Sequence, residues 1–255
     1  MMTFDGVVYG PVHSRRLGLS LGINLLPTEN KVCSFECVYC ECGFTKKGVS
    51  AKFPSLQKVE EEMTSCLRTL NAEGKHLDVI TFAGNGEPTL YPHFEEVIDL
   101  TIRLRDQFHP NSKISVLTNA TRLANESVVR ALKKVDNNIL KIDSAIDSTA
   151  KLIDAPVDSH YSVDRVVEQM AQFDGEFILQ TMFLRGVVEG KKIDNTTEEE
   201  VKAWYEAVKR MSPKEIMIYS IDRETPYKDL EKVSHEELEK IAGPLREAGF
   251  DVQTV

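Results

Sequence analysis

The feature that most constrains how this chain can fold is a regular alternation of short apolar runs with helical stripes. The runs are rich in β-branched residues, which favour strands because they pack well on a pleated sheet. They occupy residues 17–26, 77–83, 113–119, 138–144, 176–184 and 215–221. Between them, apolar residues recur at the spacing of one helix face, at residues 56–70, 97–102, 128–132 and 163–173. The pattern predicts six buried strands separated by helices.

Helix caps and connection lengths refine this prediction. Ser162 is a candidate cap for one helix, and capping boxes that begin at Thr197 and Ser234 precede two others. Each connection between strands is long enough for a crossover helix, so we predict a parallel sheet with helices outside it. Functional side chains are then expected at the carboxyl ends of the strands. Periodicity alone does not decide whether the sheet curls into a partial barrel or stays open.

Length, charge and apolar content limit the function. The chain has 255 residues and no internal repeat or flexible linker, so we predict one domain. It contains no apolar run of the ~18 residues that a membrane span needs and no secretory signal, which predicts a cytoplasmic protein without a membrane partner. A net charge of -9 disfavours nucleic-acid binding, although a local basic patch can still provide it.

Four of the five cysteines lie in one short loop after the first predicted strand. In a reducing cytoplasm, such clustering indicates metal binding or redox chemistry rather than disulfides. Cys33, Cys37 and Cys40 are spaced C-x3-C-x2-C, and they can bind three irons of a [4Fe–4S] cluster while the fourth iron stays open to a substrate. Structural zinc is the alternative, but it normally needs a second pair of ligands, which the chain lacks.

The other two cysteines have less specific interpretations. Cys42 follows Cys40 so closely that both reach a single ion only with difficulty. An accidental surface thiol is favoured for Cys42, and a regulatory or substrate-side thiol stays open. Cys66 lies on an apolar helical stripe and is predicted to belong to the core. The histidines are scattered without metal-binding spacing, so histidine metal chemistry has no support.

Two motifs together resemble the radical S-adenosylmethionine (SAM) superfamily. The first is the cysteine loop, with Tyr39 before its last ligand cysteine, and the second is GNGEP at residues 84–88, directly after the second predicted strand. Glycine lets the backbone approach a ligand closely, and carboxylate and carbonyl oxygens accept hydrogen bonds from an ammonium group. A tight strand-to-helix turn is the structural alternative for GNGEP alone. Segments along nearly the whole chain, such as VLTNAT and LKIDSAID, are similar to small stand-alone proteins grouped with the wyosine-base (tRNA-modifying) synthases.

The resemblance implies a fold, cofactors and a reaction. The implied fold class is α/β, a partial (β/α)6 TIM-like barrel of parallel strands with outer helices, as a single domain over residues 1–255. Residues 1–16 are then an N-terminal arm, 17–221 the barrel core and 222–255 a C-terminal extension with a helix. The implied cofactors are one [4Fe–4S] cluster and SAM, in an oxygen-sensitive enzyme of oxidoreductase type. The reduced cluster cleaves SAM to methionine and a 5′-deoxyadenosyl radical, which abstracts hydrogen from a substrate.

The resemblance also implies which residues contact SAM. Within the motifs, the candidates are Tyr39, Gly84, Asn85, Gly86 and Glu87. At the ends of later strands, the candidates for SAM are Asn119, Lys141, Asp143 and Gln180, and Arg223 is the candidate for a SAM or substrate carboxylate.

All of the strand-end candidates except Gln180 have a structural alternative. A loop-capping role is the alternative for Asn119, and a surface salt bridge is the alternative for Arg223. Lys141 and Asp143 share one face of their strand, where charges are rarely buried without a partner, so a mutual ion pair is the alternative to a ligand contact. Residues 15 and 16, both arginines, are interpreted as a solvated basic pair, or alternatively as a cover for the site. No catalytic acid or base stands out.

The sequence favours some partners over others. No cysteine precedes Cys33, so the second cluster of true wyosine-base synthases is not expected, and the acidic charge also argues against tRNA. A small-molecule or protein substrate is therefore favoured, with a flavodoxin- or ferredoxin-like protein as the external electron donor that the resemblance implies. A wyosine-like tRNA-modifying enzyme stays an alternative. A non-catalytic module that binds an iron–sulfur cluster or zinc is another, but a purely structural metal needs no GNGEP motif.

Overall fold

The structure has the α/β architecture that the sequence predicts. It is a computed structural model that describes residues 3–14, 17–50 and 52–255, so the predictions for Arg15 and Arg16 lie outside the described residues. Six strands coincide with the six predicted runs. They are β2 (Gly18–Ile23), β3 (Val79–Phe82), β4 (Lys113–Thr118), β5 (Asn137–Lys141), β6 (Ile178–Val188) and β8 (Glu215–Ser220). These six strands pair in parallel with their neighbours, in chain order.

Helices connect the strands at the predicted places. They are α1 (Leu56–Ala72), α2 (Phe94–Phe108), α3 (Glu126–Leu132), α5 (Val163–Met170), α6 (Glu198–Met211) and α7 (His235–Glu247), with the short 3-10 helices η1 (Pro88–Leu90) and η2 (Ala171–Phe173). The capping box of Ser234 is complete. Ser162 occupies the cap position of α5 without a side-chain bond, and Asp147 instead accepts the N–H of Val163 (2.8 Å). Among the described helices, none combines the length and hydrophobicity that crossing a bilayer requires.

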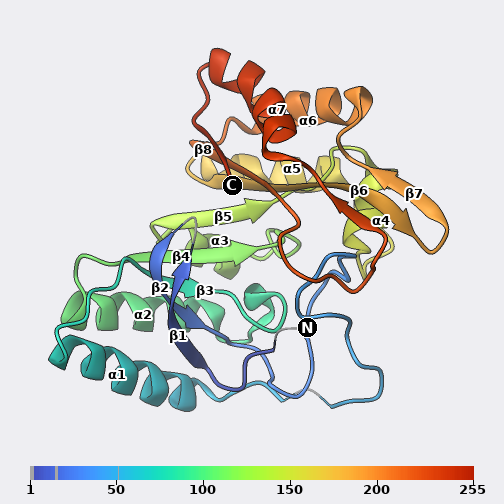
Figure 1. Cartoon of the computed structure of the whole chain (residues 1–255). Coiled ribbons are helices and arrows are strands. Elements are labelled where there is room, and N and C mark those ends of the chain that lie inside the picture. The colour runs from blue at the N-terminus through green and yellow to red at the C-terminus, as the bar shows by residue number, and fades with distance from the viewer. Residues whose placement is uncertain (1–2, 15–16, 51) are drawn as a thin grey trace.

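The sheet curves around a lumen without closing. Side chains from β2, β3, β4, β5, β6 and β8 line one common cavity, which places the inner face of the sheet on the concave side. The strand order is β1-β2-β3-β4-β5-β6-β8-β10, so two different strands form the edges. Figure 1 shows α1 and α2 near one end of the sheet and α6 and α7 near the other. The fold is therefore the partial barrel that the resemblance implied.

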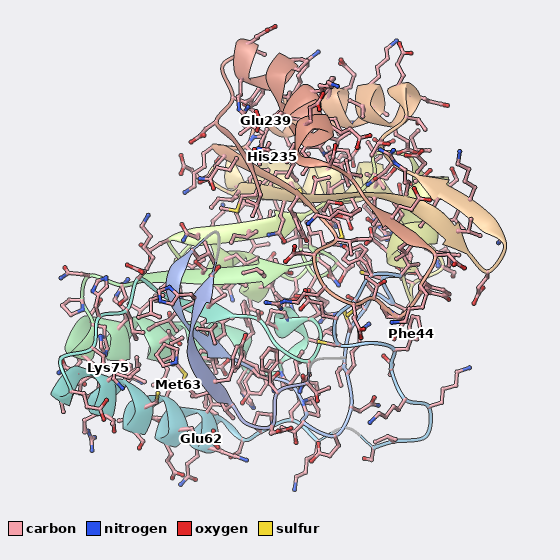
Figure 2. All side chains as sticks on the ribbon, viewed as in Figure 1. Phe44, Glu62, Met63, Lys75, His235 and Glu239 are labelled. Carbon is pink, nitrogen blue, oxygen red and sulfur yellow. The ribbon has the colours of Figure 1, made fainter. Side chains whose placement is uncertain are left out.

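The two faces of the sheet carry different side chains. On the outer face, alternate residues such as Ile80 and Phe82 belong to the main apolar cluster with the helices, where Met63 of α1 is fully buried (Figure 2). On the inner face, the buried apolar clusters are smaller. One consists of Ile139, Ile178 and Met217, and the other joins Met182 of β6 to Val38, Tyr39 and Ile153 among others. Helix packing on the outer face thus stabilises the fold, and the inner face is left with room for polar side chains.

Several elements were not predicted. The strand β1 (Val8–Ser14) pairs antiparallel with β2, within the segment that was predicted as an arm. The strands β7 (Lys191–Asp194) and β9 (Leu230–Lys232) pair with β6, and β10 (Val252–Thr254) pairs in parallel with β8. The helix α4 (Asp147–Asp154) was also missed, because its two large apolar residues, Leu152 and Ile153, are adjacent and show no helical repeat. The sheet therefore extends beyond the predicted core of residues 17–221 on both sides.

One polar residue on the outer face has no partner. Asn138 of β5 is 3% exposed, and neither its amide nitrogen nor its amide oxygen finds a hydrogen-bond partner in the described part of the chain. It alternates with Ile139 of the inner face and shares the outer face with Leu140. An unpaired buried amide is costly because it loses its bonds to water on folding.

We therefore expect Asn138→Leu to stabilise the protein. The change removes an unpaired amide at nearly constant volume, and the free energy of unfolding should rise by about 1–3 kcal/mol. Urea unfolding followed by circular dichroism measures it. The matched control is Asn137→Leu, which should not stabilise, because the amide of Asn137 donates to the hydroxyl of Ser115 (2.8 Å). Equal effects of the two changes would contradict the explanation.

Candidate functional site

The cysteine loop, residues 32–43, lies between β2 and α1 and is fixed by α4. Its apolar residues Phe35 and Val38 are buried. The N–H of Glu36 donates to the carbonyl of Asp154 (3.0 Å), and the N–H of Val38 donates to the carbonyl of Ile153 (2.9 Å). The helix that the sequence analysis missed is thus an element that holds the thiols in place.

The GNGEP turn lies directly against the cysteine loop. The N–H of Val32 donates to the carbonyl of Asn85 (2.9 Å), and the N–H of Glu87 donates to the carbonyl of Val32 (3.0 Å). Gly86 has a φ of +135°, and a Cβ atom there would lie 1.9 Å from the carbonyl oxygen of Val32. Only glycine fits this position without a backbone shift. The two sequence motifs therefore meet at one place in the fold.

The carboxylate of Glu87 is already bonded within the protein. It accepts hydrogen bonds from the N–H of Asn119 (2.8 Å), from the N–H and hydroxyl of Thr89 (3.1 and 2.6 Å) and from the hydroxyl of Thr118 (2.6 Å). Burial raises the pKa of Glu87, and these hydrogen bonds oppose the rise. Glu87 thus joins the end of β3 to the end of β4.

The side chain of Asn85, a predicted SAM contact, is also used within the protein. It is 1% exposed, its nitrogen donates to the carbonyls of Phe4 (2.9 Å) and Pro27 (3.0 Å), and its oxygen accepts the N–H of Phe4 (3.0 Å). This side chain anchors the N-terminal segment. The backbone groups of the turn are therefore what GNGEP can offer to a ligand.

A buried ammonium group lies beside the thiols. Lys31 is 5% exposed, and its Nζ bonds to the carboxylate of Glu36 (3.2 Å) and the carbonyl of Gly43 (3.1 Å). Burial lowers the pKa of Lys31, but the nearby Cys40 and Cys33 outweigh this effect and raise it. Buried cations need anionic partners, so Lys31 fits an anionic group held by the thiols. Lys31 was not predicted as a site residue, although its position two residues before Cys33 indicates that it lies near the thiols.

The loop thiols have different environments. Burial raises the pKa of Cys33 to about 12 and that of Cys37 well above its usual value. A hydrogen bond with Cys42 lowers the pKa of Cys40 to about 6. No three His, Cys, Asp or Glu side chains within residues 3–14, 17–50 and 52–255 converge as ligands of one ion would.

The prediction of an accidental surface thiol at Cys42 is wrong. Cys42 is half-buried, its Sγ lies 3.4 Å from the carbonyl oxygen of Gly84, and it bonds to Cys40. The loop turns back here, since the N–H of Gly43 donates to the carbonyl of Cys40 (2.9 Å). Residue spacing alone does not reveal such a turn.

A second group of buried charges lies beside Cys37. Lys141 forms ion pairs with Asp143 (2.8 Å) and with Asp154, and its Nζ lies 3.6 Å from Cys37 Sγ. The hydroxyl of Tyr39 donates to Asp143, and the ammonium lies 5.2 Å from the centre of the Tyr39 ring. Burial raises the pKa of Asp154 to about 7. The mutual ion pair, one of the two interpretations for Lys141 and Asp143, is therefore present, and Asp154 was missed along with α4.

Asn119 links the end of β4 to the cysteine loop. Its side-chain nitrogen donates to the hydroxyl of Ser34 (2.9 Å) and lies 3.7 Å from Cys33 Sγ. Its oxygen accepts the N–H of Thr121 (3.1 Å). This is the loop-capping geometry that the sequence offered as an alternative.

The barrel lumen contains the remaining two predicted residues. The cavity has a volume of about 460 Å³ and is lined by Tyr9, Gln180 and Arg223 among others. Gln180 is 5% exposed, and its side-chain amide has no hydrogen-bond partner among the described residues, so this amide is available to a ligand. Arg223 forms the surface salt bridge that was its alternative, with Glu41 (2.6 Å).

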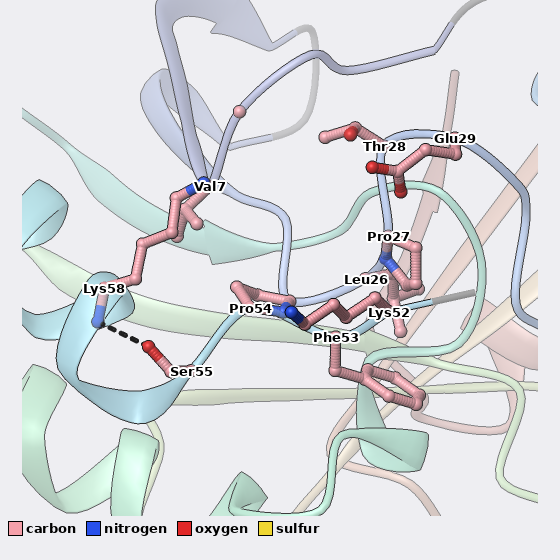
Figure 3. Close-up of a pocket in the computed structure, with 11 residues that line it drawn as sticks. Val7, Leu26, Pro27, Thr28, Glu29, Lys52, Phe53, Pro54, Ser55 and Lys58 are labelled. Carbon is pink, nitrogen blue, oxygen red and sulfur yellow. Dashed lines mark hydrogen bonds between the residues drawn. The ribbon is translucent and has the colours of Figure 1, made fainter. Parts of the chain in front are cut away.

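Another cavity lies near the start of α1 and contains no predicted site residue. It has a volume of about 400 Å³ and is lined by residues 26–29 and 52–55, with Val7 and Lys58 (Figure 3). Ser55 caps α1 there by accepting the N–H of Lys58 (3.2 Å). We assign this cavity no function.

The bonding of Glu87 predicts a structural effect of Glu87→Gln. In either amide orientation, at least one N–H of the new side chain faces a backbone N–H, of Asn119 or of Thr89. An unsatisfied buried donor should lower the free energy of unfolding by about 1–3 kcal/mol, measured by urea unfolding of the protein without cofactors. Glu61→Gln, on the exposed face of α1, is the control and should leave stability unchanged. A Glu87 variant as stable as that control would contradict the structural role.

The ion pairs of Lys141 with Asp143 and Asp154 predict a second effect on stability. Lys141→Met leaves two carboxylates buried without their cation, so the free energy of unfolding should fall by about 3–5 kcal/mol. Thermal unfolding measures the loss. The triple change Lys141→Met, Asp143→Asn and Asp154→Asn should recover much of it, because the uncompensated charge is gone. A triple variant less stable than the single one would show that packing rather than charge dominates.

Comparisons with known proteins show what this chain is similar to. The chain is 31% identical over 91% of its length to a Brachyspira hyodysenteriae protein named GTPase Obg, and it spans 32% of that protein. It is 31% identical over 92% of its length to a UPF0026 protein of Helicobacter pylori, and it spans 72% of that relative.

Solved structures share the fold at low sequence identity. Streptococcus suis SuiB bound to S-adenosylmethionine superposes with a TM-score of 0.63 and 15% identity over 89% of this chain and 48% of SuiB. TYW1 with a lysine-pyruvate adduct superposes with a TM-score of 0.62 and 16% identity over 89% of this chain and 73% of TYW1. The model of the family described as the Radical SAM superfamily matches residues 30–189, which include both motifs. The chain therefore belongs to the radical SAM superfamily, whose members use a [4Fe–4S] cluster and SAM.

Proposed function

We propose that this chain is a radical SAM enzyme in which Cys33, Cys37 and Cys40 hold the [4Fe–4S] cluster and the GNGEP backbone holds SAM. The observation that carries the proposal is the direct contact between the two motifs. Val32 of the cysteine loop bonds to both Asn85 and Glu87, and Cys42 contacts the Gly84 carbonyl. A SAM molecule bound to the open iron would therefore lie beside the carbonyl groups of the turn.

The chain's own residues then have distinct tasks. When bound and reduced, the cluster supplies the electron that cleaves SAM to methionine and a 5′-deoxyadenosyl radical. Lys31 and Lys141 supply buried positive charge beside the thiols. The carbonyl of Gly84 can accept a hydrogen bond from the methionine ammonium. Glu87, Asn119 and Asp143 keep the strand ends and the loop in register through the bonds described above.

We infer that the lumen binds the remainder of SAM and the substrate. The free amide of Gln180 supports this, because a buried amide without a partner is stabilised by any ligand that bonds to it. Arg223 at the rim can take a substrate carboxylate if Glu41 releases it. A small-molecule or protein substrate fits the acidic chain better than tRNA does. The grouping with the wyosine-base synthases stays a prediction, as does a flavodoxin- or ferredoxin-like donor.

Cysteine substitutions test the ligand set. Anaerobically reconstituted wild-type protein should hold about four irons per chain, give a paramagnetic resonance signal that SAM alters, and form 5′-deoxyadenosine after chemical reduction. Cys37→Ala should lose both the iron and the product, because a cluster held by two thiolates is unstable.

Two controls define the ligand set further. Cys66→Ala, on α1, should behave as wild type, and Cys42→Ala should keep the iron. Loss of the iron in Cys42→Ala but not in Cys40→Ala would mean that a different set of thiols holds the cluster. Bound zinc, or a cluster indifferent to SAM, would refute the proposed function itself.

A further inference from the structure

A pocket outside the barrel reaches the cysteine loop by a second route. It has a volume of about 630 Å³ and lies between the loop after β4, the segment after α4 and helix α5. Cys33 and Ser34 form part of its wall. The lumen cavity instead meets the loop at Glu41. The two cavities therefore approach the thiols from different parts of the loop.

The outer pocket carries an exposed apolar side chain that is attached directly to the cysteine loop. Val157 is 69% exposed, which is unusual for a residue held in place by the backbone. Its N–H donates to the carbonyl of Ser34 (2.9 Å), and the preceding residue, Pro156, forms a β-bridge with Phe35. A partner that covered Val157 would therefore lie next to the peptide that follows Cys33.

The pocket is also locally positive in an acidic chain. Arg122 is exposed and forms no salt bridge in the described part of the chain. Arg165 adds a second guanidinium group, which pairs with Asp158 (3.3 Å). Two guanidinium groups thus face one carboxylate here, although the net charge of the whole chain is -9.

Two of the three neighbouring carboxylates are paired with other cations. The groove on the other side of Arg122 contains Glu95, Glu96 and Asp99, and Glu96 lies 3.3 Å from His93, which is charged only when protonated. Glu95 is paired with Arg130 (2.9 Å), and Asp99 is paired with Lys134 (2.7 Å). Arg122 itself forms no ion pair in the described part of the chain, and Glu96 is the one carboxylate of the groove without a permanent cationic partner, so the guanidinium group can still attract an anionic surface.

We propose that this pocket, marked by Arg122, Arg165 and Val157, is the docking surface for the electron donor, an acidic one-electron carrier protein such as a flavodoxin. The inference rests on the proposed function, because it needs a cluster at Cys33. Electron tunnelling weakens steeply with distance, so the donor must approach the cluster, and Cys33 is the ligand exposed to this pocket. Redox partners use small interfaces with complementary charge, which suits a pocket of this size.

The transfer itself is balanced. Flavodoxin hydroquinone loses one electron and becomes the semiquinone, and the oxidised cluster gains that electron. No bond in the chain forms or breaks. A donor bound at the outer pocket also leaves the lumen free for SAM and substrate.

The test compares a protein donor with a small one. Arg122→Glu and Val157→Asp are the variants, and Arg103→Glu on α2 is the matched control with the same charge change. Binding of oxidised flavodoxin at low ionic strength is measured first, and cluster reduction by flavodoxin hydroquinone is measured by stopped-flow absorbance. Photoreduced 5-deazariboflavin, a small neutral donor, then reduces the same samples.

Both variants should bind flavodoxin roughly tenfold more weakly and accept its electrons roughly tenfold more slowly, and the difference for Arg122→Glu should shrink at high salt. Arg103→Glu should match wild type, and deazariboflavin should reduce all four proteins equally.

Two results would overturn the docking site. One is that both variants bind flavodoxin as tightly as the wild-type enzyme does and that their clusters are reduced by it at the wild-type rate. The other is slow reduction by deazariboflavin as well, because the substitutions would then act on the cluster. The binding measurement does not depend on SAM cleavage, so failure of the proposed function would be seen separately, as a wild-type protein that binds flavodoxin but makes no 5′-deoxyadenosine.

Discussion

The position of the cysteine loop depends on one buried ammonium group paired with two buried carboxylates. Lys141 and Asp143 come from the end of β5, whereas Asp154 comes from α4, and the backbone of α4 in turn bonds to the loop. A charge in such surroundings is tolerated only when it is paired. The loop is thus held by buried apolar side chains, by backbone hydrogen bonds to α4 and by an electrostatic contact between segments far apart in the sequence. A contact of this kind fixes one arrangement, because a shifted loop or helix would separate the charges.

The candidate site has a buried lysine on either side of the thiols. Lys31 precedes the loop and Lys141 lies beyond it, and both are largely withdrawn from water. Protein interiors strengthen electrostatic interactions, so these two cations oppose the rise that burial causes in the pKa of Cys33 and Cys37. The hydrogen bonds of Glu87 and Asn119 connect the strand ends and the cysteine loop around these sulfur atoms.

Much of the fold could be predicted from the sequence because the central strands are buried and β-branched, and because the helices between them have clear apolar stripes. The strand β1 was not predicted, because Gly10 and Pro11 interrupt the alternation of apolar and polar residues along it. The helix α4 was not predicted because its large apolar residues are adjacent rather than spaced along one face, and Asp154 was missed with it. The thiols and the GNGEP turn could be identified from the sequence, because both motifs are defined by local residue spacing. The motifs did not show that Asn85 bonds to the N-terminal segment or that Cys42 folds back onto Gly84, since those contacts are set by tertiary structure.

The open barrel leaves β1 as an edge strand, and such edges invite pairing with strands of other molecules. Pro11 sits in the middle of this strand and lacks the N–H that an incoming strand would need. The register of β1 against β2 also shifts between Tyr9 and Val12, which bends the edge away from a flat template. The irregularity that prevented the prediction of this strand from the sequence therefore protects the edge against aggregation. A regular alternating strand in place of β1 would make the protein more prone to aggregate.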